Sequence, residues 1–335
     1  MRYTFALSLL MLFSLPVLCD ESAATIRFLS HAEARAALTT GAERGYYARL
    51  QLPEMRAKTG LALENVTLEA AREQVRETYG ARVEDFSADE QAALREVVTG
   101  LQTLLRTRAP LYARTPWVFI KVESTIEGGL PHTRGDCIVL SDALLARIVQ
   151  MHAKSASSAP LSLWNLLVHE QTHVLQRRHP ELFVNLYTQS LGFHHVVFAP
   201  PPQWLIERNV LNPDAPDADW IFPVGDAAAR HWILPEVLLL KLEHPRMPDD
   251  FDVVAIDVRE RDGAWGFADR SMPASLQELS ALPDFLRAFP VHEEMFHPNE
   301  ISAGLLAAII TGSGIEHPEH PLWNKTRAWA DQALR

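Results

Sequence analysis

The spacing of hydrophobic and polar positions changes along the chain and predicts its elements. Before residue 115, apolar residues recur every three or four positions, which predicts amphipathic helices. Ser87-Ala88-Asp89-Glu90 has the form of a capping box at the start of one of them. After residue 116, short β-branched and aromatic runs predict strands. The expected helices cover residues 31–39, 67–79, 88–105, 142–151, 162–178 and 181–191, and the expected strands 117–123, 136–140, 232–242, 251–259 and 263–267.

These elements predict an α+β fold that is mostly helical, with a small antiparallel sheet beside the helix at 162–178. Residues 20–115 are expected to form a helical N-terminal lobe, and residues 116–335 a metal-binding domain. Glycine and proline separate the first two strands, which predicts either an ordinary hairpin or a sheet edge that pairs with an extended peptide. The acidic run from Asn212 to Asp219 lacks the ligand spacing of a calcium loop and is expected to be a solvated turn region.

The first residues have the order of a secretory signal peptide. Met1-Arg2 is positive, Tyr3 to Leu18 is apolar, and Asp20-Glu21 ends the run. We predict a signal peptide over residues 1–19 and a secreted or periplasmic protein. A lipoprotein acylated at Cys19 is the less favoured alternative, because Leu18 is bulkier than the small residue expected before such a cysteine.

The amino-acid composition indicates which kinds of binding partner this protein is expected to have. A hydrophobic content of 47% with 22% charged residues is typical of a globular protein. The net charge of −11 and the lack of a Lys/Arg-rich run argue against binding to nucleic acid or an anionic membrane. After residue 19 no stretch reaches the length of a membrane span. If Cys19 leaves with the signal peptide, Cys137 is alone and the mature fold has no internal disulfide.

The candidate chemistry lies in His169-Glu170-Gln171-Thr172-His173, on the helix predicted at 162–178. Residues four apart on a helix differ by about 40° in azimuth and about 6 Å along the axis, so both imidazoles can reach one metal ion. Neutral imidazole suits Zn²⁺, and Glu170 is placed to take a proton from a zinc-activated water. The plain alternative is a pair of hydrogen-bonded core histidines on an apolar helix.

A third protein ligand is expected, and three candidates compete for the role. His179 follows His169 by ten residues, but Gln176 stands where a turning glycine would be needed, and a continuing helix would carry His179 about 240° away from His173. Glu300 follows Pro298 at the head of an apolar run, which predicts a position in the first turns of a helix. The set of His292, Glu293 and His297 is the third candidate, although its histidines do not share a helix face. We favour Glu300.

The chain also resembles a known family. His169-Glu170-x-x-His173, followed far downstream by Asn299-Glu300, resembles the gluzincin metallopeptidases, such as the thermolysin-like enzymes. With Leu186-Tyr187, Asn212-Pro213-Asp214 and His297-Pro298 the chain is similar to a group of uncharacterised secreted bacterial zincin-like proteins. The likeness covers about residues 162–310. It implies a zincin-like fold, Zn²⁺ bound by His169, His173 and Glu300, and Glu170 as the general base.

These observations predict a secreted zinc-dependent hydrolase, a metallopeptidase that acts on a peptide or protein substrate. The alternative is a catalytically inactive protein of the cell envelope that binds metal or a partner. Ala303 and Gly304 stand where the thermolysin-like enzymes have an acid that orients a histidine, so the orientation that the family gives to His173 has no counterpart in this sequence. The candidates for stabilising the oxyanion are Tyr187, His194, His195 and His231.

Overall fold

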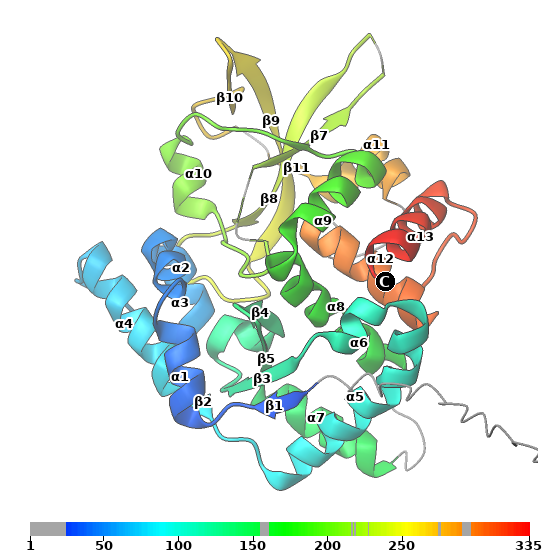
Figure 1. Ribbon diagram of the computed structural model, residues 1–335. Coiled ribbons are helices and arrows are strands. Elements are labelled where there is room, and N and C mark those ends of the chain that lie inside the picture. Colours follow the sequence, from blue (N-terminus) through cyan, green and yellow to red (C-terminus); the bar gives the residue numbers. More distant parts are fainter. Residues whose placement is uncertain are drawn as a thin grey trace, which may run out of the picture.

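A computed structural model describes residues 25–154, 161–215, 217, 219–226, 228–273, 276–289 and 296–335. Helices surround a five-stranded sheet in one part of the chain, and a six-stranded sheet lies beyond them (Figure 1). The predicted signal peptide and Cys19 lie outside the described residues. Within these ranges no helix combines the length and the apolar character needed to cross a membrane.

Three of the N-terminal helices begin where their sequence signals place them, whereas three others were not predicted. Ser30 and Glu33 form a capping box at the first helix, and Ser87 and Glu90 form the predicted one at the fifth. Thr67 caps the fourth helix through its hydroxyl. The helices are α1 (His31–Thr39), α2 (Glu43–Arg49), α3 (Leu52–Thr59), α4 (Leu68–Ala81), α5 (Ala88–Arg108) and α6 (Pro110–Arg114). Of these, α1, α4 and α5 are the predicted ones, and α2, α3 and α6 were not predicted.

The five-stranded sheet is mixed. Its strands are β1 (Ile26–Phe28), β2 (Val83–Glu84), β3 (Trp117–Val122), β4 (His132–Arg134) and β5 (Cys137–Ser141), in the order β1-β3-β5-β4 with β2 also on β3. β3 is parallel to β1 and β5, whereas β2 pairs antiparallel with β3 and β4 with β5. β1 and β2 come from the first 115 residues, so this sheet joins the predicted lobe to the rest of the chain; the domain division there stays a prediction.

The predicted hairpin of the strands at 117–123 and 136–140 is wrong, because these strands run parallel. The chain reverses twice between them. A 3₁₀ turn, η1 (Ile126–Gly129), contains Gly128 and Gly129 at positive φ and leads into β4, and a second turn at Gly135 returns the chain into β5. β4 therefore takes the edge of the sheet and lies next to the helix that carries the histidines.

The six-stranded sheet is antiparallel throughout and confirms the strands predicted near 232–242, 251–259 and 263–267. The antiparallel sheet expected beside the helix at 162–178 is confirmed only in part, because the sheet that contacts this helix through β4 and β5 is mixed. The order of the six-stranded sheet is β10-β9-β8-β7-β6, with β11 on β9. The strands are β6 (His194–His195), β7 (Trp220–Val224), β8 (His231–Leu239), β9 (Phe251–Arg261), β10 (Ala264–Phe267) and β11 (Gln277–Glu278).

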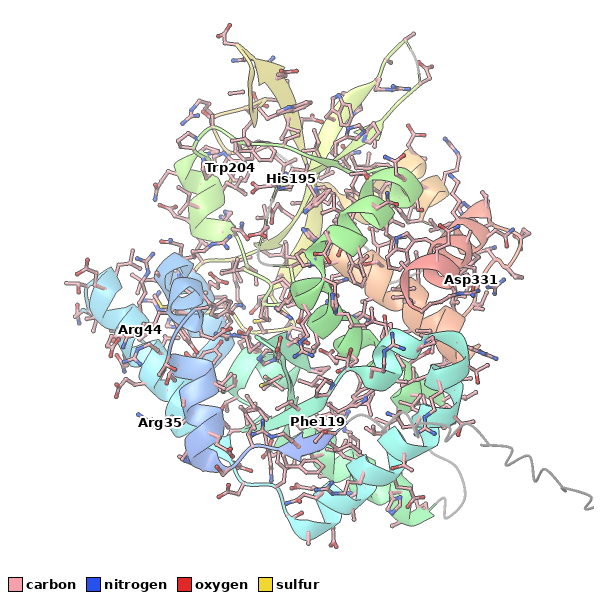
Figure 2. All side chains as sticks on the ribbon, in the orientation of Figure 1. Arg35, Arg44, Phe119, His195, Trp204 and Asp331 are labelled. Carbon is pink, nitrogen blue, oxygen red and sulfur yellow. The ribbon has the colours of Figure 1, made fainter. Side chains whose placement is uncertain are left out.

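The remaining helices build the part of the core that positions the candidate site. α8 packs against α12 along its length, and buried leucines of both helices share one hydrophobic cluster. In Figure 2, Phe119 lies inside this region, whereas Arg35 and Arg44 lie on the outside of the N-terminal helices. These elements are α7 (Asp142–Lys154), α8 (Leu161–Arg178), α9 (Pro180–Asn185), a π turn η2 (Leu186–Leu191), α10 (Gln203–Arg208), η3 (Leu279–Ala281), α11 (Pro283–Ala288), α12 (Pro298–Thr311) and α13 (Pro321–Ala333).

Candidate metal centre

Three side chains from two helices converge at the centre of the molecule. His169 and His173 project from α8, and Glu300 lies in the first turn of α12, as the proline at the head of that helix predicts. The two Nε2 atoms lie 3.0 Å apart, and Glu300 Oε2 lies 3.2 Å from that of His169 and 3.4 Å from that of His173. Among the described residues, these three form a group that could hold a metal ion.

The protonation of His173 follows from its neighbour Gln176. The Gln176 amide nitrogen lies 2.9 Å from Asn299 O, a carbonyl that only accepts, so this end of the side chain is the donor. The amide oxygen therefore faces His173 Nδ1, at 2.8 Å, and Nδ1 must carry the hydrogen. A neutral His173 then presents the lone pair of Nε2 to the other two ligands. Sequence reasoning missed this contact between Gln176 and His173.

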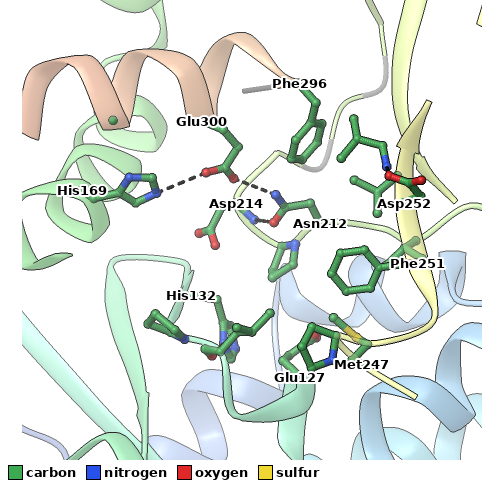
Figure 3. Close-up of a pocket in the computed structure, with 18 of the residues that line it drawn as sticks. Glu127, His132, His169, Asn212, Asp214, Met247, Phe251, Asp252, Phe296 and Glu300 are labelled. Atoms are coloured by element: carbon green, nitrogen blue, oxygen red, sulfur yellow. Dashed lines mark hydrogen bonds and ion pairs between the residues drawn. The ribbon is translucent and has the colours of Figure 1, made fainter. Parts of the chain in front are cut away.

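Asn212 fixes the third side chain. Its amide nitrogen donates to Glu300 Oε1 at 2.6 Å, which leaves Oε2 for the two histidines (Figure 3). The segment from Asn212 to Asp219 was expected to be a solvated turn region. The turn is present and Asp217 is exposed, but the expectation is wrong for Asp214, which is buried and lines the cavity at the site together with Asn212. The reason is hydrogen bonding to distant elements, including Asn299 to Asp214 O at 2.9 Å.

Glu170 lies beside the triad and is 3% exposed. Its Oε2 accepts from the Thr133 hydroxyl at 3.1 Å, which joins α8 to the edge strand β4. Burial, and then the charge of Asp214, raise the pKa of Glu170 to about 8. In its buried position beside Asp214 the carboxyl group therefore favours its neutral form, and a cation at the triad would favour the ionised form.

Even without a cation, the three side chains of the triad shift one another's pKa values strongly. Burial opposes ionisation, but the charge of His173 and the hydrogen bonds of both histidines hold the pKa of Glu300 well below its usual range. Burial would lower the pKa of His173, but Glu300 and Asp214 raise it to about 10. A positive charge is therefore favoured at this point of the molecule, either as a proton or as a metal ion.

A cavity of about 770 Å³ opens on the site. His169, Glu170 and Glu300 line it on one side, with Asn212 and Asp214 beside them (Figure 3). Met247 and Phe251 lie across the cavity from His169, with the polar residues Glu127, His132 and Asp252 near them, whereas Phe296 lies beside Glu300 (Figure 3). Phe285, Leu286 and Phe289 are further large apolar residues of the lining.

The other candidate ligands do not join the triad. His179 lies at the junction of α8 and α9, where Nδ1 is 3.9 Å from Glu181. His297 caps α12 by accepting from Asn299 N, and its Nε2 donates to Asp217 O at 2.9 Å. His292 and Glu293 lie outside the described residues.

None of the four oxyanion candidates is among the residues that line this cavity. Tyr187 is buried between α9 and the second sheet, with its ring against Trp220. The three histidines belong to the second sheet: His194 contacts Trp232, His195 contacts Trp220, and His231 lies 3.7 Å from Asp257.

Comparison with protein-family models, with curated proteins and with solved structures finds no match for this chain.

Proposed function

We propose that this protein is a secreted zinc-dependent hydrolase of the zincin-like fold that cleaves peptide bonds, with His169, His173 and Glu300 as ligands and Glu170 as general base. The observation that carries the proposal is the size of the triad. Zinc bonds of about 2.0–2.1 Å in a tetrahedron place neighbouring ligand atoms about 3.3 Å apart. The separations of 3.0, 3.2 and 3.4 Å match this edge length.

The donor set also fits zinc. Two imidazole nitrogens and one carboxylate oxygen are the ligands of a known class of catalytic zinc site, and three protein ligands leave a fourth position for water or substrate. Gln176 and Asn212 supply the supporting hydrogen bonds that orient such ligands. The resemblance to gluzincins, which rests on the motif residues, agrees with this assignment.

The reaction assigned to the site is hydrolysis of an amide. Zinc, when bound, polarises the scissile carbonyl and lowers the pKa of water. Glu170 takes a proton from the attacking water as the water oxygen bonds to the carbonyl carbon, and returns it to the nitrogen as the carbon–nitrogen bond breaks. Thr133 holds one oxygen of Glu170 through its hydroxyl, so the carboxyl group keeps its position through both transfers.

Metal content and turnover test the assignment separately. Glu300→Ala should lose zinc, whereas His179→Ala, a control from the end of the same ligand helix, should keep it. Glu170→Gln should keep zinc and lose chelator-sensitive cleavage of casein or a peptide library by at least about a hundredfold. A zinc-loaded Glu170→Gln that still cleaves would refute the assigned base.

The alternative function is metal or partner binding without turnover. The wild-type protein would then bind zinc in a one-to-one ratio and cleave no member of the library. Export is tested independently by the N-terminal sequence of the mature protein, which should begin after residue 19.

A further inference from the structure

The edge of β4 that is not paired with β5 bears on how a substrate can bind. In an antiparallel pair, backbone groups of alternate residues point toward and away from the partner strand. Thr133 is the residue of β4 that points away from β5, because its N–H donates to Asp214 Oδ1 at 2.8 Å and its C=O accepts from Arg177 at 3.0 Å. Pro131, the next position of the same orientation, has no N–H. The groups needed to add a strand here are therefore used or absent.

The two side chains that cover this edge are held from several directions. Arg177 also donates to Pro213 O at 2.5 Å, and it lies 3.6 Å from Asp214. The backbone of Asp214 is bound on both sides, by Asn212 Oδ1 at its N–H and by Asn299 at its C=O. An extended peptide would have to displace both side chains, and in doing so would disturb the loop that holds Glu300.

The cavity offers a different means of attachment. Its lining includes aromatic and aliphatic side chains from β9 and α11, such as Phe251, Phe285 and Leu286, beside the charged residues Glu127 and Asp252. Its volume of about 770 Å³ is sufficient for a large apolar group together with the reacting amide. Leu130 and Leu286, at 40% and 47% exposure, belong to the same lining and extend the apolar surface toward solvent.

We infer that the cleft takes short amide substrates, such as small peptides or N-acyl amino acids, which are held by one bulky apolar group and do not pair with β4 as a strand. This inference rests on the proposed function and specifies its substrate class. Flanking residues of a longer peptide gain no backbone hydrogen bonds at the sealed edge, so they add little to binding.

A length series tests the inference. Blocked peptides of two, four, eight and twelve residues would share one central bond next to phenylalanine, and kcat/KM would be measured with the zinc-loaded enzyme. We expect kcat/KM to change by less than about threefold with length, and to fall about tenfold or more when alanine replaces the phenylalanine. A rise of about tenfold between two and eight residues would overturn the inference, because it would show binding along the backbone.

Binding to zinc-loaded Glu170→Gln, measured by calorimetry with the same peptides, separates the two proposals. Affinity that depends on phenylalanine and not on length, without turnover by the wild type, would support the cleft assignment and refute the hydrolase. Peptides that are neither cleaved nor bound would refute both.

Paired variants test the apolar part of the cavity lining. Phe251→Ala should weaken the preference for phenylalanine, whereas Phe198→Ala, a matched loss of a half-buried ring outside the cavity, should leave it unchanged. Equal effects of the two variants would overturn the role of this lining.

Discussion

Gln176 gives the most direct test of how the chain orients the proposed metal ligands. Its side chain makes three hydrogen bonds, to His173 Nδ1 at 2.8 Å, to Asn299 O at 2.9 Å and to the Ser302 hydroxyl at 3.0 Å, and it is 5% exposed. Gln176→Leu removes all three. Asn299 O keeps the Ser302 hydroxyl as a donor, so the unsatisfied group left behind is the N–H of His173.

From this geometry we estimate how much zinc affinity and how much stability Gln176→Leu should lose. Loss of the partner that orients a metal-binding histidine reduces metal affinity about 10–100-fold, equivalent to about 1.4–2.8 kcal/mol. A buried N–H without an acceptor destabilises the metal-free fold by about 1–3 kcal/mol. Gln176→Glu keeps an acceptor for His173 but places a negative charge against Asn299 O, so its zinc affinity should lie between those of the wild type and Gln176→Leu.

The assay is competition for zinc against a chromophoric chelator, with thermal unfolding of the metal-free protein as a second measurement. Gln171→Leu is a matched control, because Gln171 is a buried glutamine of the same helix that donates to Thr115 O and Pro116 O. Both variants should lower the unfolding temperature, but only Gln176→Leu should lose zinc affinity. A Gln176→Leu protein that binds zinc within about threefold of the wild type would refute the role of this residue.

Three further predictions follow. Asn212→Leu should weaken zinc binding about tenfold, measured by the same competition, because Glu300 Oε1 loses its donor. Chelation of zinc should lower the unfolding temperature of the wild type, because the folded state loses the stabilisation that zinc binding provides. Acidification should release zinc as the histidines protonate. Burial raises the pKa of Glu54 to about 7, whereas Lys58, against the effect of burial, lowers that of Glu127 to about 2. Glu127 therefore stabilises the fold above pH 4.5, and up to about 3 kcal/mol is lost as the pH falls through 2; Glu54 has the opposite sign, and its contribution improves as the pH falls from 7 to 4.5. The free energy of unfolding, measured with urea at a series of pH values, should no longer fall between pH 4.5 and 2 in Glu127→Gln. In Glu54→Gln it should no longer rise as the pH falls from 7 to 4.5.

Local signals in the sequence were sufficient for six of the helices and for two of the candidate ligands, but α2, α3, α6, α10, α11 and α13 were not predicted. The capping boxes at Ser30 and Ser87 act within three residues, and the spacing of His169 and His173 is fixed by one helix turn. Parallel pairing of β3 with β5 could not be obtained in this way. The direction of β5 depends on two reversals of the chain, and strand propensity is the same for a parallel and an antiparallel partner.

The support of the metal site was beyond sequence reasoning for a related reason. Gln176 and Asn212 are ordinary polar residues whose function depends on what lies opposite them, and their partners Asn299 and Glu300 are far away in the chain. Polar residues in a helix or a proline-rich turn are most often solvated, so pattern alone favoured that reading of the segment from 212 to 219. Burial makes that expectation wrong for Asp214, because a polar group removed from water must form a hydrogen bond within the protein. The hydrogen-bond partners of Gln176 and Asn212 include His173 and Glu300, two of the candidate ligands, so α8, α12 and the loop carrying Asn212 must pack correctly before the three candidate ligand atoms reach their separations of 3.0–3.4 Å. We therefore expect metal affinity to depend on tertiary packing, and variants of Gln176 and Asn212 should change it although neither residue is itself a candidate ligand.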